Sequence, residues 1–208
     1  MKKFALLVVI VVAPLVGAVL AQSPEQPKKQ DAGAATKPAD REQPGEMPPM
    51  PPPPGEHHKW LEKLVGTWSF ESEMGGAGEQ PTKCTGTDTV RSLGGRWVIG
   101  ELKSEMPGMG PMNAVMTLGY NPESGKYQGT WVDSITDHLW VYEGTLDPTR
   151  KILTLEAEGP NMMDPTKGNT KYRDVIEFKS ADHRTLTSSA LVDGKWVQFA
   201  TANYRKTK

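Results

Sequence analysis

The stretch EHHKWLEKLVGTW, residues 56–68, decides the fold. Its first part carries apolar residues at the spacing of a helix face, namely Trp60, Leu61, Leu64 and Val65. Gly66 is expected to end this helix, because glycine is common just past a helix C-terminus. Trp68 then begins a region with the alternation of β-strands. The stretch therefore predicts a short helix that leads directly into the first strand of a sheet.

Ten short runs of alternating apolar and polar residues follow, and turn residues close each one. Their approximate ranges are 67–74, 82–92, 95–105, 113–120, 126–133, 138–146, 151–158, 171–179, 184–192 and 195–205. Asn121 to Gly125 forms a loop with proline early and glycine late, and Asp193-Gly194 is a strong hairpin signal. No long helical pattern appears after residue 66, so the sequence predicts sequential antiparallel strands.

An antiparallel sheet of this length tends to curl and close, because closure removes its exposed edges. We therefore expect an all-β, up-and-down barrel of about 8–10 strands with a short N-terminal helix and room for one small ligand. A two-sheet β-sandwich is the alternative. The longest irregular segment, GPNMMDPTKGN at residues 159–169, is expected to form a loop at one end of the barrel.

The N-terminal quarter of the chain has a different composition. Residues 1–21 combine a basic start, an apolar run and small residues before Gln22, which is the pattern of a secretory signal peptide. A transmembrane anchor is the alternative. Residues 22–56 are polar and rich in proline, so we expect a disordered linker and then a domain over residues 57–208. The protein would be periplasmic or extracellular, with no stable membrane anchor after cleavage.

Charge and cysteine content exclude some classes of partner and structure. The formal net charge of −1 argues against a nucleic-acid partner. Cys84 is the only cysteine, so the chain holds no internal disulfide, and we expect this thiol to be buried. The sequence does not indicate the oligomeric state.

Two resemblances support the barrel. The short helix that leads into Gly-x-Trp on the first strand resembles the entry motif of lipocalins. In lipocalins an arginine at the end of the last strand lies across this tryptophan. The matching pair here is Trp68 and Arg205. The segments GGRWVIGE (94–101), TLGYNPESGKYQGTWVDS (117–134) and YRDVIEF (172–178) resemble the bacterial domain of unknown function 1579 family. This resemblance implies a lipocalin-like, commonly exported barrel, and it implies no established activity or catalytic residues.

Residues two apart on a strand share a face, and this suggests a ligand site. Tyr127, Trp131 and Asp133 share one face, and His138, Trp140 and Tyr142 share a face of the next run. A tight connection would bring Asp133 close to His138, either as a functional pair or as a surface turn contact. Arg173 shares a face with Glu177 and would supply an inward ion pair or an anion-binding group. The alternative for Trp131 and Trp140 is plain core.

Standard catalytic motifs are absent, including Gly-x-Ser-x-Gly, His-Glu-x-x-His and phosphate-binding glycine loops. His138 or His183 would be the candidate axial ligand if the barrel held haem. Met106, Met109 and Met112 place three thioethers at regular spacing, a pattern that suits Cu(I). The alternative is that these methionines are flexible apolar cover in a loop.

Three function classes follow from these observations. The first is an exported barrel that binds a small apolar or amphipathic ligand. The second is an enzyme, haem-linked or isomerase-like, and the third is an interaction protein of the cell envelope. Fold and compartment favour the binding protein over the enzyme. The sequence does not identify a cofactor.

Overall fold

The computed structural model describes residues 50, 52–75, 80–108 and 110–208. The expected signal peptide and most of the expected linker lie outside the described residues. The elements in chain order are α1 (Glu56–Leu61), η1 (Glu62–Leu64), β1 (Gly66–Met74), β2 (Thr82–Leu93), β3 (Trp97–Met106), β4 (Gly110–Asn121), β5 (Lys126–Asp133), β6 (Trp140–Leu146), β7 (Ile152–Pro160), η2 (Pro165–Lys167), β8 (Asn169–Ser180), β9 (His183–Val192) and β10 (Lys195–Lys206). No helix in the described part of the chain is long and apolar enough to cross a membrane.

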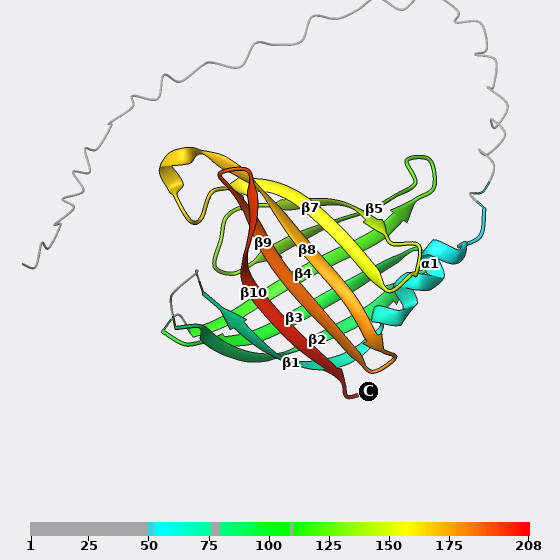
Figure 1. Ribbon diagram of the computed structural model, residues 1–208. Coiled ribbons are helices and arrows are strands. Elements are labelled where there is room, and N and C mark those ends of the chain that lie inside the picture. The colour runs from blue at the N-terminus through cyan, green and yellow to red at the C-terminus, as the bar shows by residue number, and fades with distance from the viewer. Residues whose placement is uncertain (1–49, 51, 76–79, 109) are drawn as a thin grey trace, which may run out of the picture. The chain divides into compact units, whose positions relative to one another are not determined.

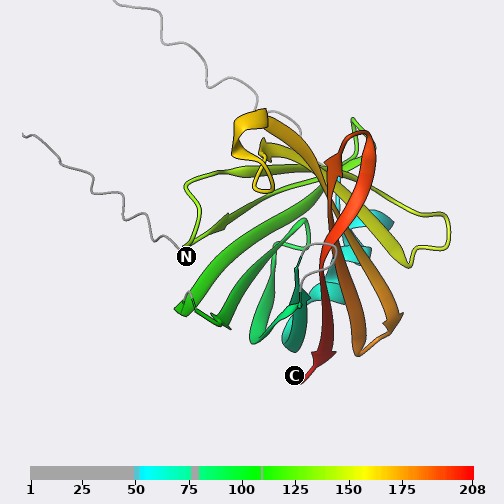
Figure 2. The same cartoon turned by 60° about the vertical axis from the view of Figure 1, so that its left-hand side comes forward.

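The ten strands form one closed antiparallel barrel, in which each strand pairs with its neighbours in sequence (Figures 1 and 2). Closure occurs between β1 and β10, whose register runs from Trp68 opposite Lys206 to Met74 opposite Ala200. The prediction of an up-and-down barrel is confirmed, and the sandwich alternative is excluded.

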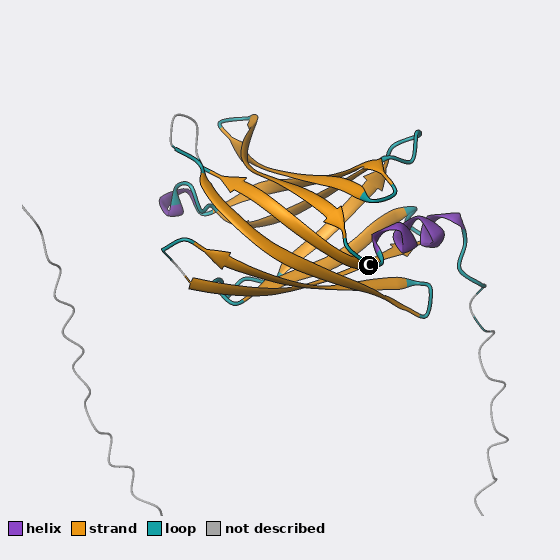
Figure 3. Cartoon of the chain, turned by 90° about the horizontal axis from the view of Figure 1, so that it is seen from below, coloured by secondary structure: helices purple, strands orange, loops and turns teal. Residues whose placement is uncertain are grey.

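Successive strands run in opposite directions, so the connections divide between two ends of the barrel. Helix α1 lies at one end and η2 at the other, as the view from below shows (Figure 3). We call these the helix end and the η2 end. The β4–β5, β6–β7 and β8–β9 turns share the helix end, whereas the β5–β6 and β7–β8 connections share the η2 end.

Gly66 has a different role from the one predicted. The helical segment ends at Leu64, Val65 is already extended, and Gly66 is the first residue of β1. Its φ of 134° suits glycine, and a Cβ atom there would lie 2.6 Å from the carbonyl oxygen of Lys208. Gly66 therefore permits the close approach of the C-terminus where the barrel closes.

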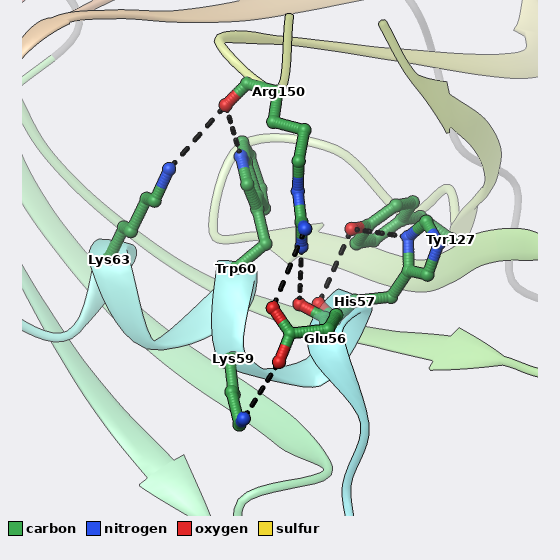
Figure 4. Close-up of polar contacts among 7 residues, drawn as sticks. All are labelled: Glu56, His57, Lys59, Trp60, Lys63, Tyr127 and Arg150. Carbon is green, nitrogen blue, oxygen red and sulfur yellow. Dashed lines mark hydrogen bonds and ion pairs between the residues drawn. The ribbon is translucent and has the colours of Figure 1, made fainter. Parts of the chain in front are cut away.

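Helix α1 is fixed to the helix end through Arg150 in the β6–β7 turn (Figure 4). Trp60 Nε1 donates to the Arg150 carbonyl at 2.9 Å, and the Arg150 guanidinium donates to the Glu56 carbonyl at 2.7 Å. The Tyr127 hydroxyl donates to the His57 carbonyl at 3.3 Å. Trp60 and Tyr127 are each 1% exposed, so this end of the barrel is filled by side chains.

The predicted pairing of Trp68 with Arg205 is wrong. Tyr204 points inward, so the next residue, Arg205, points outward and is exposed. Arg184 of β9 takes its place: the guanidinium carbon lies 4.8 Å from the centre of the Trp68 ring. Lys206, the last residue of β10, also places its ammonium group 5.3 Å from the ring centre, so two cations other than Arg205 lie near Trp68.

Candidate functional site

A cavity of about 260 Å³ occupies the η2 half of the barrel interior. Its aromatic wall is formed by Phe70, Trp131, Trp140, Tyr142, Tyr172, Phe199 and Tyr204. Two pairs of these rings meet edge to face, with 4.9 Å between the centres of Trp140 and Tyr172 and 6.2 Å between those of Tyr172 and Phe199, and Phe70 lies tilted against Tyr204 at 5.1 Å. Such contacts fix ring orientation, so the wall is preformed.

Asp174 of β8 is the buried carboxylate of this cavity. It lies on the inward face with Tyr172 and Ile176. The Tyr142 hydroxyl donates to Oδ2 at 2.7 Å, and the Ser188 hydroxyl donates to Oδ1 at 2.5 Å. Burial raises the pKa of Asp174, although these two hydrogen bonds oppose that shift. Asp174 keeps some accessible surface, and that surface faces the cavity.

A second, smaller cavity of about 40 Å³ lies beyond Asp174. Its wall contains a buried ion pair, in which the guanidinium of Arg184 contacts Asp88 Oδ2 at 2.5 Å. The Arg184 guanidinium also lies 4.3 Å from the centre of the Tyr204 ring, while its Nε finds no hydrogen-bond partner among the described residues. Burial raises the pKa of Asp88, and the charge of Arg184 opposes this shift.

Asp133 stands at the η2 end of the cavity. Trp131 Nε1 donates to its Oδ2 at 2.9 Å, and the backbone amides of Ile135 and Thr136 donate to its Oδ1 at 3.0 and 2.8 Å. Ile135 and Thr136 also line the cavity. Asp133 therefore shapes the β5–β6 connection where it borders the cavity and holds the Trp131 ring in place.

Four of the seven predicted ligand-binding residues line this cavity: Trp131, Asp133, Trp140 and Tyr142. Tyr127 also points inward, but it lies at the helix end, where its ring contacts Trp60 at 5.7 Å. It belongs to the packed core beneath α1 and does not line the cavity.

Arg173 points outward, contrary to the predicted inward pair with Glu177. Tyr172 and Asp174 occupy the inward face of β8, so the residue between them faces solvent. Arg173 instead donates through Nε to Glu156 at 3.0 Å and stacks on Trp196 at 3.9 Å. Glu177 contacts Lys179 at 2.6 Å.

His138 does not join Asp133. Strand β6 begins only at Trp140, and His138 Nε2 lies 3.3 Å from the Glu158 carbonyl of β7. Among the described residues that line the cavity there is no histidine, and His183 lies at the opposite end of the barrel, in the β8–β9 turn region. Neither of the two histidines suggested as a haem ligand therefore lines the cavity.

Four polar residues of the barrel interior were not predicted as site residues: Asp88, Asp174, Arg184 and Ser188. A signal for one of them was available. Asp174 alternates with Tyr172, Ile176 and Phe178, so it interrupts an otherwise apolar face. A carboxylate in such a position is expected to be buried and specifically hydrogen-bonded.

Sulfur atoms gather at the same cavity. Met106 and Met112 line it, and so do Met74, Cys84 and Met162, while Met109 lies outside the described residues. Met106 ends β3 and Met112 is in β4, so these two belong to strands rather than to a loop. Cys84 is buried, as expected. No group of three or more His, Cys, Asp or Glu residues in the described part of the chain is arranged to hold a metal ion.

Comparisons with known proteins agree with the fold. A family model described as "Protein of unknown function (DUF1579)" matches residues 53–206. A search of curated proteins finds no significant match. The crystal structure of Rv2717c from M. tuberculosis is 13% identical, with a TM-score of 0.56, over 74% of this chain and 99% of that one. These values show a shared barrel fold.

Two further solved structures have lower TM-scores. The S-type phycobiliprotein lyase CPES from Guillardia theta is 11% identical over 72% of this chain and 92% of that one, with a TM-score of 0.49. A redesigned β-barrel bound to DFHBI is 14% identical over 73% of this chain and 100% of that one, with a TM-score of 0.36.

Proposed function

The chain belongs to the DUF1579 family of proteins of unknown function, and we propose that it is an exported barrel protein that binds a small apolar or amphipathic ligand. The observation that carries this proposal is the 260 Å³ cavity inside the barrel. Protein interiors are close-packed, and voids much larger than a water molecule are few. An apolar cavity with a few convergent polar groups is the usual form of a small-molecule site.

The cavity volume limits the size of the ligand. At about 30 Å³ per water molecule, 260 Å³ corresponds to roughly nine waters. A molecule of about ten non-hydrogen atoms fits this space, and a larger ligand would extend past Ile135 and Met162, the exposed lining residues. A single aromatic ring with a short substituent fits this size.

Export is the second part of the proposal, and residues 1–21 support it through the pattern of a secretory signal. Cell fractionation followed by mass measurement of the intact chain tests this part. We expect a periplasmic or secreted protein that begins at Gln22. A cytoplasmic chain that retains residues 1–21 would contradict export.

Native mass spectrometry of the protein purified from its own envelope fraction tests ligand binding. We expect an added mass that disappears on denaturation. Ala202 lines the cavity and is 6% exposed, so Ala202→Phe is expected to fill the space and abolish the added mass. Asn203→Phe places the same ring on the outward face of the same strand and is the matched control. A wild-type protein without added mass, or an Ala202→Phe variant that retains it, would contradict the proposal.

A second candidate function is Cu(I) binding, which the five sulfur-containing residues at the cavity favour. We expect submicromolar Cu(I) affinity, measured by competition with a chromophoric chelator. Replacing Met106, Met109 and Met112 by leucine keeps the apolar volume and removes three thioethers. A wild-type protein without submicromolar Cu(I) affinity would exclude the candidate, and unchanged affinity in the triple variant would exclude Met106, Met109 and Met112 as the ligands.

A further inference from the structure

The described part of the cavity wall carries acidic side chains and no basic one. Two carboxylates line the cavity, Asp133 at the η2 end and Asp174 deep in the barrel. None of the described residues that line it is lysine, arginine or histidine. The surroundings of the bound ligand are therefore acidic, and this bears on the sign of the charge that the ligand carries.

The charge of Asp174 is not neutralised by its hydrogen-bond partners. Both partners, Tyr142 and Ser188, are neutral hydroxyl donors. A carboxylate has about four acceptor positions, so two donors leave acceptor capacity unused. Arg184 lines the small cavity with Asp174, but its guanidinium is engaged with Asp88 and lies between the rings of Trp68 and Tyr204.

The aromatic wall also favours a cation. The face of an aromatic ring carries partial negative charge, so an ammonium group near it is attracted, and the attraction increases when water is excluded. Trp131, Tyr142 and Tyr204 line both the main cavity and the small one, as Asp174 does. A positive group beside Asp174 would therefore be close to several rings.

An anionic ligand meets the opposite situation. A carboxylate in the cavity would face Asp133 and Asp174 without a lysine, arginine or histidine among the lining residues to bind it. Two close carboxylates repel each other, and one of them would have to bind a proton. The lining thus excludes simple organic acids and favours amines.

We propose that the ligand is a small apolar or aromatic amine, whose ammonium group binds Asp174 while its apolar part fills the aromatic cavity. This inference rests on the proposed function, because it identifies the ligand class of the same cavity. It gives the polar residues distinct roles: Asp174 binds the charged group, and Tyr142 and Ser188 orient the carboxylate. Asp133 contributes negative charge at the η2 end.

Three probes of nearly equal size test the charge preference. Isothermal titration calorimetry at pH 7 on the purified exported chain would compare 2-phenylethylamine, 2-phenylethanol and phenylacetate. We expect the amine to bind at least about tenfold more tightly than the alcohol, since one charge-assisted hydrogen bond in a buried site contributes about that factor. We expect no detectable binding of phenylacetate.

Asp174→Asn removes the charge while it keeps the side-chain shape, and it is expected to abolish the preference for the amine over the alcohol. Asp193→Asn makes the same substitution in the exposed β9–β10 turn, where asparagine tolerates the φ of 47°, and is expected to keep the preference. If wild-type protein bound the alcohol or the acid as tightly as the amine, or more tightly, the inference would be overturned and the proposed function would stand. Failure of all three probes to bind would overturn both. The wild-type comparison decides the question even if Asp174→Asn does not fold.

Discussion

The buried ion pair between Arg184 and Asp88 illustrates how single residues hold the barrel interior together. The guanidinium and the carboxylate come from β9 and β2, which are not neighbours in the barrel, so the contact spans the interior. Arg184 is 4% exposed and Asp88 is 7% exposed. Such a pair costs much desolvation energy, and neither residue tolerates the loss of its partner.

Arg184→Met is therefore expected to lower the free energy of unfolding by about 3–5 kcal/mol, because it leaves Asp88 buried without a counter-charge. Urea denaturation monitored by tryptophan fluorescence measures the change. The exposed pair of Lys83 with Glu73 provides the control, and Lys83→Met is expected to cost less than about 1 kcal/mol. Equal effects of the two substitutions would contradict the importance of the buried pair.

Asp174 gives the protein a distinct dependence of stability on pH. Burial raises the pKa of Asp174 in the folded protein above its unfolded value of about 3.9. The folded state therefore holds this proton more tightly, so the group destabilises the fold as pH rises from the unfolded value to the raised folded value. The groups that face it are Tyr142 and Ser188, with Asp133 towards the η2 end and Asp88, Arg184 and Tyr204 around the small cavity.

We expect the stability of Asp174→Asn relative to wild type to increase with pH through this window and then to level off. Comparing the two proteins by urea denaturation at a series of pH values cancels the contributions of the other titrating groups. A difference that stays constant with pH would show that the folded pKa of Asp174 is not raised. The ionised form also binds the proposed amine, so amine affinity is expected to weaken as pH falls through the folded pKa.

Among the elements, the β6–β7 turn determines where helix α1 lies. Asp147 accepts hydrogen bonds from the backbone amides of Thr149, Lys151 and Ile152, and these bonds hold the turn in shape. Arg150 adopts a φ of 57° within this turn and presents its carbonyl to Trp60. The closed helix end thus depends on the five-residue β6–β7 turn, residues 147–151, as well as on helix packing.

Hydrogen bonds to the carboxylate, chiefly from the Thr149 hydroxyl, lower the pKa of Asp147 to about 2. The stability that this group contributes is fully present above the unfolded pKa of about 3.9 and is lost as pH falls towards 2. We expect Asp147→Ala to be less stable than wild type at neutral pH and the difference to vanish near pH 2. Glu123→Ala, in the β4–β5 turn at the same end, is the control. A carboxyl titration of Asp147 with a midpoint near 3.9 would contradict the prediction.

For the whole molecule, the sequence predicted the architecture well because its signals are local. Alternation along each strand and turn residues such as Asp193-Gly194 depend on near neighbours, and every predicted strand overlaps an observed one. The cavity was harder to predict, because strand closure decides which residues meet. Adjacent residues of a strand point to opposite faces of the sheet, so the sequence predicts that Arg173 and Asp174 face opposite ways. Which of the two faces becomes the barrel interior is determined only when the barrel closes. Arg184 and Asp88 lie 96 positions apart, so no local pattern joins them.

Barrel closure itself yields the last prediction. Residues 204–208 supply the final pairs of β10 with β1, and the Thr207 amide donates to the Thr67 carbonyl at 2.7 Å. Removing them deletes the buried ring of Tyr204, which alone is expected to cost about 3–5 kcal/mol, a large share of the stability of a typical domain. It also exposes the edge of β1, which favours aggregation.

We therefore expect the chain that ends at Asn203 to lose cooperative thermal unfolding and to associate, as measured by calorimetry and by light scattering after size exclusion. Arg205→Ala in the full chain changes an outward-facing, exposed side chain of the same segment and is expected to leave both properties unchanged. A truncated chain with the size and Tm of the full chain would mean that the barrel stays closed without its last pairs. Closure would then rest on the interior contacts of Arg184 rather than on the β1–β10 ladder, because that side chain joins β9 to β2 across the barrel.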